Sequence, residues 1–264
     1  MTDTKRVMIV GCPRSGTTLL QAILSAHDEV FSLPETHFYP QLCSSNPFFR
    51  YLGISTQAAR TNLIQIGKDH LNKKIKTSLL TKELSQSFLE ALDQASQIRG
   101  KTTWIEKTPQ NLWFLPFIKK NSKSIRFIHI EREPKDVIAS IHYASTKHPE
   151  SWGYQDIDHC INLYKESKVI NDQYRSTESH YFCKYEDLTT DTTNVIKGML
   201  KFCKLEFYED LLHNYKKSRN FISRESDLWT SGISSEIKLQ ESRFYKHFPK
   251  EDQNYILKKL DKLS

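Results

Sequence analysis

A turn near the N-terminus has the residue types and the spacing to bind a phosphate or sulfate group. Residues 11–18 read GCPRSGTT, which fits the phosphate-loop pattern G-x-x-x-x-G-x-[ST] between a predicted strand and a predicted helix. The backbone N–H groups of such a turn, with the start of the following helix, offer several donors and a partial positive charge to an anion. Gly16 lets the backbone approach closely. We therefore expect an anion-binding site rather than an ordinary strand-to-helix turn.

The residue at position 17 separates two classes of chemistry. A nucleoside triphosphatase needs Lys there to reach the terminal phosphates, next to a hydroxyl that binds Mg²⁺. This chain has Thr17, and its cation comes earlier, at Arg14. The loop is therefore expected to hold a phosphate or sulfate without the usual apparatus for magnesium-assisted phosphoryl transfer. An atypical nucleotide kinase is the less favoured alternative.

Alternating strands and helices are predicted to position this loop. Five short apolar runs read as strands, and apolar residues recur at helical spacing after most of them. The predicted strands are residues 7–10, 30–32, 104–106, 126–130 and 181–185, and the helical stretches are 19–24, 111–120, 137–141, 195–202 and 255–263. This order predicts an α/β, P-loop-type three-layer fold, in which helices flank a central parallel sheet and the ligand lies at the carboxyl ends of the strands.

Two segments interrupt the alternation. Residues 41–100 are polar, with modest apolar stripes, and are predicted to form a helical insertion near the site. Residues 216–250 are basic and aromatic without clear periodicity, and are predicted to form a loop that covers the ligand. Because no repeat or Gly/Ser linker divides the chain, residues 1–264 are expected to form a single domain.

Composition excludes several classes of protein. A hydrophobic content of 38% suffices for a substantial core, and the net charge of +7 suits an anionic ligand. No apolar run approaches the length of a membrane span, and the only apolar stretch near the N-terminus is residues 7–10, so a soluble, cytoplasmic protein is expected. The five cysteines are odd in number and lack a CxxC, which argues against a disulfide framework and a metal site.

The loop resembles that of a known family. Residues 13–20, PRSGTTLL, resemble the 5′-phosphosulfate loop of the sulfotransferases that use 3′-phosphoadenosine 5′-phosphosulfate (PAPS). The bacterial, carbohydrate and tyrosylprotein branches are closest, because they favour Arg where the small-molecule cytosolic branch has Lys. The resemblance implies PAPS as donor, 3′-phosphoadenosine 5′-phosphate (PAP) as product, and no metal. The cofactor-binding residues that it implies here are Arg14, Ser15, Gly16, Thr17 and Thr18.

Two later motifs resemble the same family. Arg132 and Ser140 lie eight residues apart across a strand-to-helix turn, like the family's 3′-phosphate site, where a guanidinium fork and a hydroxyl can bind one phosphate. Taken alone, Arg132 would read as a solvated loop charge. Tyr185 begins the sequence YEDL at a predicted strand end, a place near the nucleotide in relatives; core packing is the equal alternative.

Catalytic roles are implied for a carboxylate and a lysine. Glu35, in the sequence LPETH, matches the position of the catalytic carboxylate of the tyrosylprotein branch and is expected to be the general base, against the alternative of an exposed loop acid. Lys107, in EKTP, resembles the family lysine that contacts the bridging oxygen between sulfate and phosphate. Pro109 replaces the catalytic His of the small-molecule branch, which leaves His37 as the rival base.

The sequence thus predicts a sulfotransferase that moves the sulfuryl group of PAPS to a hydroxyl, or less often an amine, by in-line displacement. A further nucleotide contact is implied near the C-terminus, at Arg243 or equally at Lys238. A carbohydrate, a tyrosyl peptide and a small alcohol all remain open as acceptor, and the oligomeric state is open too. Outside catalysis, the alternative is a polyanion or nucleic-acid binding protein, although no nucleic-acid motif is present.

Overall fold

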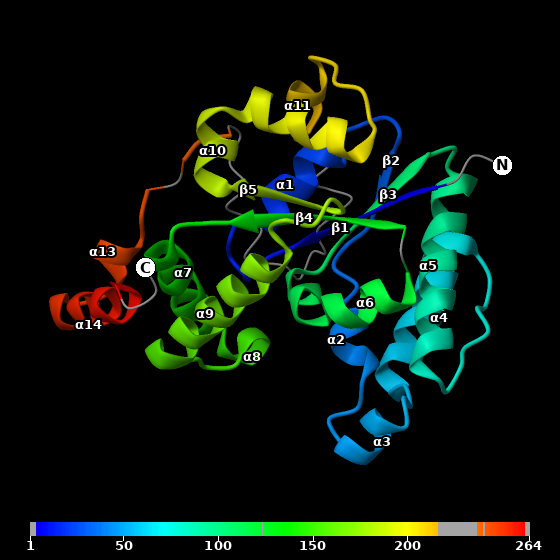
Figure 1. Cartoon of the computed structure of the whole chain (residues 1–264), viewed down its shortest axis with the longest axis horizontal. Coiled ribbons are helices and arrows are strands. Elements are labelled where there is room, and N and C mark those ends of the chain that lie inside the picture. The colour runs from blue at the N-terminus through cyan, green and yellow to red at the C-terminus, as the bar shows by residue number, and fades with distance from the viewer. Residues whose placement is uncertain (1–3, 123, 216–236, 240, 262–264) are drawn as a thin grey trace.

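Five parallel strands form one sheet at the centre of the molecule. The structure is a computed structural model that describes residues 4–122, 124–215, 237–239 and 241–261. The strand order is β2-β3-β1-β4-β5 (Figure 1). The strands are β1 (Lys5–Val10), β2 (Val30–Ser32), β3 (Thr103–Lys107), β4 (Ile125–Glu131) and β5 (His180–Lys184). The predicted α/β class with a parallel sheet is confirmed.

Helices lie on both faces of this sheet, so the three-layer arrangement is also confirmed (Figure 1). Within the described residues, no helix combines the length and the apolar character that crossing a bilayer requires. The helices are α1 (Thr17–Leu24), α2 (Phe38–Leu42), α3 (Pro47–Tyr51), α4 (Gln57–Leu71), α5 (Thr81–Ile98), the 3₁₀ helix η1 (Pro109–Phe114), α6 (Leu115–Asn121), α7 (Pro134–Lys147), α8 (Pro149–Trp152), α9 (Ile157–Tyr174), α10 (Tyr185–Thr190), α11 (Thr192–Cys203), α13 (Phe244–His247) and α14 (Lys250–Leu260).

Predicted strand ends at residues 7–10, 104–106 and 126–130 are one or two residues short, and three further predictions were wrong. The stretch 111–120 is split between η1 and α6, because Pro109 and a second proline each start a helical turn. Tyr185 begins α10 and does not end the preceding strand. The last helix begins at Lys250 rather than Tyr255, since Pro249 occupies its N-cap and acidic residues favour its first turn.

Alternation along the strands divides the core between the two faces. Val7 and Ile9 pack with helices α1 and α11, whereas Met8 and Val10 pack with α2, α4 and α5. These four side chains are fully buried. Side chains that point alternately to opposite faces of a buried parallel strand explain why the run is continuously apolar.

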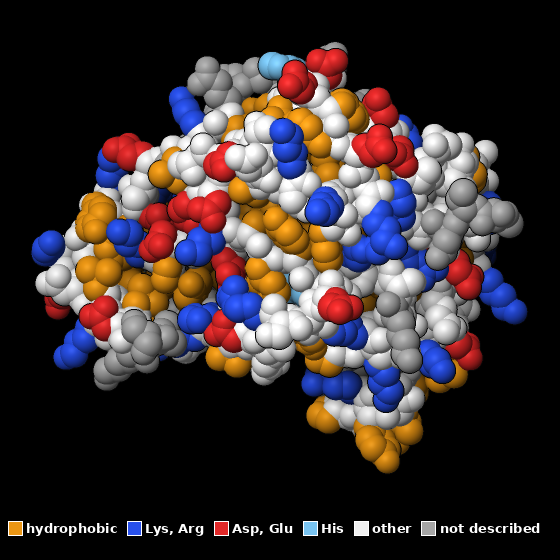
Figure 2. Space-filling model, turned by 45° about the horizontal axis from the view of Figure 1, so that its top comes forward, with side chains coloured by type: hydrophobic (Ala, Val, Ile, Leu, Met, Phe, Trp, Pro, Cys, Tyr) orange, Lys and Arg blue, Asp and Glu red, His pale blue; other side chains and the backbone are white. Residues whose placement is uncertain are grey.

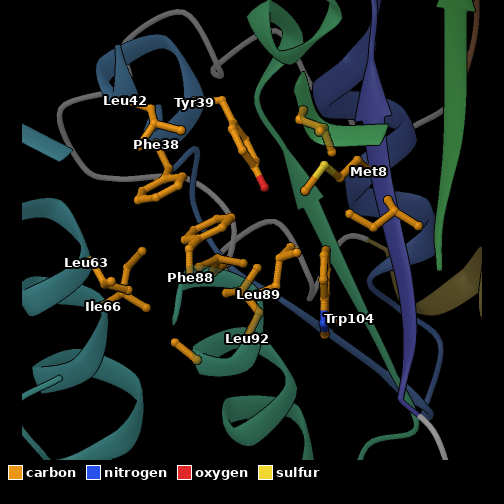
Figure 3. Packing of buried hydrophobic residues seen from close by; sticks show 14 of the residues in the cluster. Met8, Phe38, Tyr39, Leu42, Leu63, Ile66, Phe88, Leu89, Leu92 and Trp104 are labelled. Atoms are coloured by element: carbon orange, nitrogen blue, oxygen red, sulfur yellow. The ribbon is translucent and has the colours of Figure 1, made fainter. Parts of the chain in front are cut away.

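The segment 41–100, predicted as an insertion near the site, supplies one layer of the core. Figure 3 shows side chains of α4 and α5 converging on those of α2 and on Trp104 of β3. The rings of Phe38 and Phe88 stack with centroids 4.1 Å apart. The indole of Trp104 donates to Asp93 of α5 at 2.8 Å. The helices α4 and α5 of the segment 41–100 thus pack against the sheet and position it.

A third cluster covers the carboxyl end of β4. It joins α7, α9, α13 and α14 through buried side chains such as Val137, Cys160, Phe244 and Ile256. In Figure 1 this group lies on the side of the sheet toward which β4 points. The carboxyl end of β4 therefore faces a wall built from α7, α9, α13 and α14.

Two buried histidines tie β4 to β5 and α9. Asn171 of α9 donates through Nδ2 to Glu131 at 3.1 Å, so its Oδ1 accepts from Nδ1 of His129, 2.8 Å away. His129 Nε2 then accepts from Nδ1 of His180 at 2.7 Å. Both imidazoles are consequently held neutral. Burial lowers the pKa of His129 to about 4 and that of His180 to about 3.

These histidines should make the fold acid-sensitive. In the unfolded chain they take up protons below about pH 6.5, while the folded chain excludes those protons down to about pH 4, so the free energy of unfolding should fall as the pH drops through this window. The slope is up to about 1.4 kcal/mol per pH unit for each histidine. Urea denaturation across the window measures it. We expect the double variant His129→Leu/His180→Phe to flatten the slope and His213→Gln, on the surface, to leave it unchanged.

Candidate active site

The predicted phosphate loop connects β1 to α1 in a turn that requires glycine. Gly16 occupies the N-cap of α1 with φ 97°, and a Cβ there would lie 2.4 Å from the ring of Tyr185. Arg14 also adopts a positive φ, 71°. The N–H of Ser15 donates to Cys12 O at 3.2 Å and closes the turn. The first N–H groups of α1 have no intrahelical acceptor and point out of the helix start, as anion binding requires.

The loop borders a cavity of about 560 Å³, a size typical of small-molecule sites. The predicted site residues that line it are Arg14, Gly16, Thr17, Thr18, Glu35, Arg132, Ser140, Tyr185 and Arg243. The two predicted anion anchors thus face the same space. One ligand can therefore contact both.

Like charges converge at this cavity. Arg14 Nε donates to Ser140 Oγ at 3.1 Å, and Arg132 donates to the backbone O of Arg14 at 3.4 Å. The Arg132 guanidinium lies 4.4 Å from the ring centroid of Tyr185. Burial first, then the charges of Arg243 and Arg132, lower the pKa of Arg14 to about 10. The guanidinium remains protonated at neutral pH, and an anion in the cavity would relieve the repulsion.

Ser15 differs from the other loop residues. Its hydroxyl is buried, has no hydrogen-bond partner among the described residues, and lines a small second cavity behind the loop with Cys12 and Tyr164. Arg132 reaches this second cavity as well, and its Nε is also buried without a partner in the described part of the chain. The Ser15 side chain thus faces away from the main cavity.

The predicted catalytic pair is in contact. The Lys107 ammonium at the end of β3 donates to Glu35 and, at 3.2 Å, to the hydroxyl of Thr18. Lys107 is 2% exposed and Glu35 25%, so the lysine lies beneath the carboxylate and only the carboxylate faces the cavity. His37, the rival base, has Nε2 3.5 Å from Glu35 and also lines the cavity.

A buried carboxylate that the sequence analysis missed organises these residues. Glu106 is fully buried; it accepts from the hydroxyls of Thr36 at 2.8 Å and Thr108 at 2.6 Å, and from the amide of Asn111 at 2.7 Å. The Thr108 hydroxyl in turn accepts from the N–H of His37 at 3.2 Å. Burial raises the pKa of Glu106. Glu106 thus holds both predicted catalytic residues in place, because Lys107 follows it in the sequence and its partner Thr36 follows Glu35.

The segment 41–100 reaches the site indirectly. Asn62 of α4 donates to the backbone O of Thr36, the residue after Glu35. Among the described residues, none from 41–100 lines the main cavity. The segment therefore supports the loop that carries Glu35 without forming the cavity wall.

The wall opposite the loop was also missed by the sequence analysis. It comes from α8, α9 and the link between them, where Trp152, Gln155, His159 and Leu163 line the cavity. The Arg14 guanidinium lies 5.6 Å from the Trp152 ring centroid. No motif marks these residues, and only their place after the helix of Ser140 could have suggested them.

Both candidate C-terminal cations reach the cavity. Lys238 and Arg243 line it, and the Arg243 guanidinium lies 4.8 Å from the Tyr143 ring centroid. The neighbouring Ser242 hydroxyl donates to Asp136 of α7, which fastens this segment to the site. Of the predicted covering loop 216–250, residues 216–236 and 240 lie outside the described residues. Within the described ranges, no group of three or more His, Cys, Asp or Glu side chains is arranged to hold a metal ion.

The sequence pattern of one family extends over most of this architecture. The model named Sulfotransferase family matches residues 6–210, from the first strand past α11. The chain belongs to the sulfotransferase family. The matched range includes the loop, the Glu35–Lys107 pair and the Arg132–Ser140 turn, whereas the lining residues Lys238, Glu241 and Arg243 lie beyond it.

Two relatives match most of the chain. An uncharacterised protein of Aquifex aeolicus is 23% identical over 218 residues, covering 81% of this chain but 27% of the relative. A putative protein-tyrosine sulfotransferase of Caenorhabditis briggsae is 25% identical over 227 residues, which cover 84% of this chain and 72% of that relative. The chain thus spans about a quarter of the length of the first relative.

Solved structures share the fold of this chain. The sulfotransferase domain of the Synechococcus PCC 7002 olefin synthase superposes with a TM-score of 0.59 at 18% identity, covering 99% of this chain and 96% of that one. A mouse sulfotransferase complexed with PAP superposes with a TM-score of 0.57 at 13% identity, and the match covers 98% of this chain and 83% of that one. The sulfotransferase fold is therefore established.

Removing the Glu106 carboxylate should destabilise the site. We expect Glu106→Ala to lower the free energy of unfolding by about 2–4 kcal/mol, because three buried donors lose their acceptor. Glu106→Gln should cost less than half as much, since the buried Asn111 Oδ1 lacks a partner among the described residues and can accept from the new amide after the Asn111 side chain turns. Urea denaturation measures both, and equal losses would contradict this account of the network.

Proposed function

We propose that this protein transfers the sulfuryl group of PAPS to a hydroxyl, or less often an amine, of an acceptor. One observation carries the proposal: the loop before α1 and the Arg132–Ser140 turn border a single cavity. A donor with an anion at each end needs two such anchors in one space. The mouse enzyme of the same fold was solved with PAP, which supports a nucleotide of this class.

The residues present fit a doubly anionic nucleotide. Gly16, Thr17 and Thr18 would hold the phosphosulfate end through backbone N–H groups and hydroxyls. Arg132 and Ser140 would hold the 3′-phosphate. The fit rests on the convergence of Arg14, Arg132 and Arg243 on one cavity. Burial first, and then the charges of the other two, lower the pKa of Arg14. When bound, the donor supplies an activated sulfuryl group.

The chain's own residues would orient the acceptor and accept its proton. In the proposed reaction Glu35, the carboxylate at the cavity surface, takes the proton from the acceptor hydroxyl, and Lys107 supplies positive charge between Glu35 and Thr18 of the loop. His37 is the second candidate for the proton, because it is close to Glu35 and faces the same cavity.

The acceptor is proposed only by class. The cavity wall of Trp152, Gln155, His159 and Leu163 offers aromatic and apolar surface with amide and imidazole groups. A tyrosyl peptide, a carbohydrate and a small alcohol each present a hydroxyl that such a wall could hold. The putative protein-tyrosine sulfotransferase of Caenorhabditis briggsae supports including tyrosyl peptides among acceptors to be tested.

Nucleotide binding tests the two anchors directly. We expect Arg14→Ala and Arg132→Ala each to weaken PAP binding by about 10- to 100-fold, the size expected for losing a charge-assisted hydrogen bond. Isothermal titration calorimetry with PAP measures the change. Lys120→Ala removes the same charge from the exposed surface of α6 and should bind PAP like the wild type. Unchanged affinity in both arginine variants would refute the proposal.

Transfer assays distinguish the two candidate bases. With labelled PAPS and a panel of tyrosyl peptides, sugars and alcohols, Glu35→Gln should lower kcat about 100-fold or more, because general-base catalysis contributes that much. His37→Gln should lower it less than about tenfold by the same argument. PAP affinity should stay unchanged in both, which separates catalysis from binding. The reverse order of losses would assign the base to His37.

A further inference from the structure

An apolar lobe projects from the molecule at α3. We define the α3 lobe as six exposed large hydrophobic side chains on two neighbouring segments, and the most exposed is Tyr51 at 88%. Figure 1 shows α3 standing away from the sheet, and Figure 2 shows an apolar tip there. The side chains of the lobe are Phe48, Phe49, Tyr51, Leu52, Leu79 and Leu80. A patch of this kind on a surface marks an interaction site more often than chance exposure.

The backbone of the lobe is well organised. Asn46 caps α3 and accepts from the N–H of Phe48 at 2.9 Å, while Arg50 donates to the backbone O of Ser44 at 3.0 Å. The two segments are joined by backbone hydrogen bonds, from Ser55 to Leu79 at 2.7 Å and from residue 81 to residue 53 at 2.8 Å. The apolar side chains are thus presented outward by a fixed scaffold rather than left exposed by a loose end.

Basic residues outnumber acidic ones next to this apolar tip. Residues 44–83 contain seven Lys and Arg and two acidic residues, Asp69 and Glu83, whereas the whole chain has 38 basic and 31 acidic residues. Figure 2 shows Lys and Arg side chains next to the apolar tip. Of the seven basic residues, Lys68, Lys73 and Lys74 lie toward the far end of α4, where Lys73 contacts Gln94 of α5. The four that remain next to the lobe in the sequence are Arg50, Arg60, Lys76 and Lys82. We call these four the basic collar.

We propose that the α3 lobe binds the surface of an anionic lipid bilayer. Aromatic and leucine side chains on a projecting tip suit the boundary between headgroups and acyl chains, and the basic collar would face the lipid phosphates. A second copy of the chain is disfavoured as the occupant, because two such collars would repel each other. The segment from Glu35 through α2 leads along the chain to α3.

Vesicle flotation tests the lobe. The wild type should float with vesicles of phosphatidylcholine and phosphatidylserine and bind phosphatidylcholine alone about tenfold more weakly. The variant Phe48→Ser/Phe49→Ser/Tyr51→Ser should lose at least about tenfold in affinity for the mixed vesicles, because it lacks the inserted side chains. The matched control Ile98→Ser/Val169→Ser removes exposed apolar side chains elsewhere and should bind like the wild type. Equal binding by the lobe variant would overturn the proposal.

A charge variant provides a second measurement. Lys76→Glu/Lys82→Glu should weaken flotation with the mixed vesicles and leave PAP binding unchanged, so a failure here is distinct from a failure of the proposed function. Unfolding temperatures of all variants show that each is folded. Equal binding of the wild type to both vesicle types, or no binding to either, would overturn the proposal. So would sedimentation velocity showing a wild-type dimer that the lobe variant abolishes, because the lobe would then be a protein interface.

Discussion

The parallel pairing of β1 with β4 is the constraint on which the site depends. Val10 lies opposite His129, so the loop after β1 and the turn after β4 leave the sheet side by side. A Cβ at Gly11 would lie 2.6 Å from the backbone O of Ile130, which shows how closely the two strand ends approach. Arg14 and Arg132 are therefore forced together on the same cavity. The sheet holds two like charges where one anionic ligand can neutralise both.

Two buried polar networks fix the strand ends on either side of that cavity. Glu106 joins β3 to the loop of Glu35, and His129 with Asn171 joins β4 to α9, which carries part of the cavity wall. Such networks specify position because each buried group needs its partner. The histidine network also makes the free energy of unfolding fall in acid, because its neutral histidines bind no proton in the folded state.

The sequence was informative where the signal is local. The loop of Gly16 and the strand that ends before Arg132 could be anticipated, because a strand, a turn and a motif lie within a few residues of one another. Glu35 and Lys107 are 72 residues apart, and only the family resemblance placed them in one site. Glu106 could not, since its partners come from elements that only the fold brings together. The role of 41–100 as a core layer was missed for the same reason: its apolar stripes are modest, and the surface that they cover lies on other elements.

The contact between Lys107 and Glu35 limits how the proposed reaction can proceed. An ammonium that is 2% exposed needs an anion beside it, and Glu35 is that anion in this structure. In the proposed reaction, phosphate oxygens at Thr18 would compete for the same ammonium, which already touches that hydroxyl. Binding of the donor would thereby release Glu35 from this contact, so the pair would couple the availability of the carboxylate to the presence of the donor.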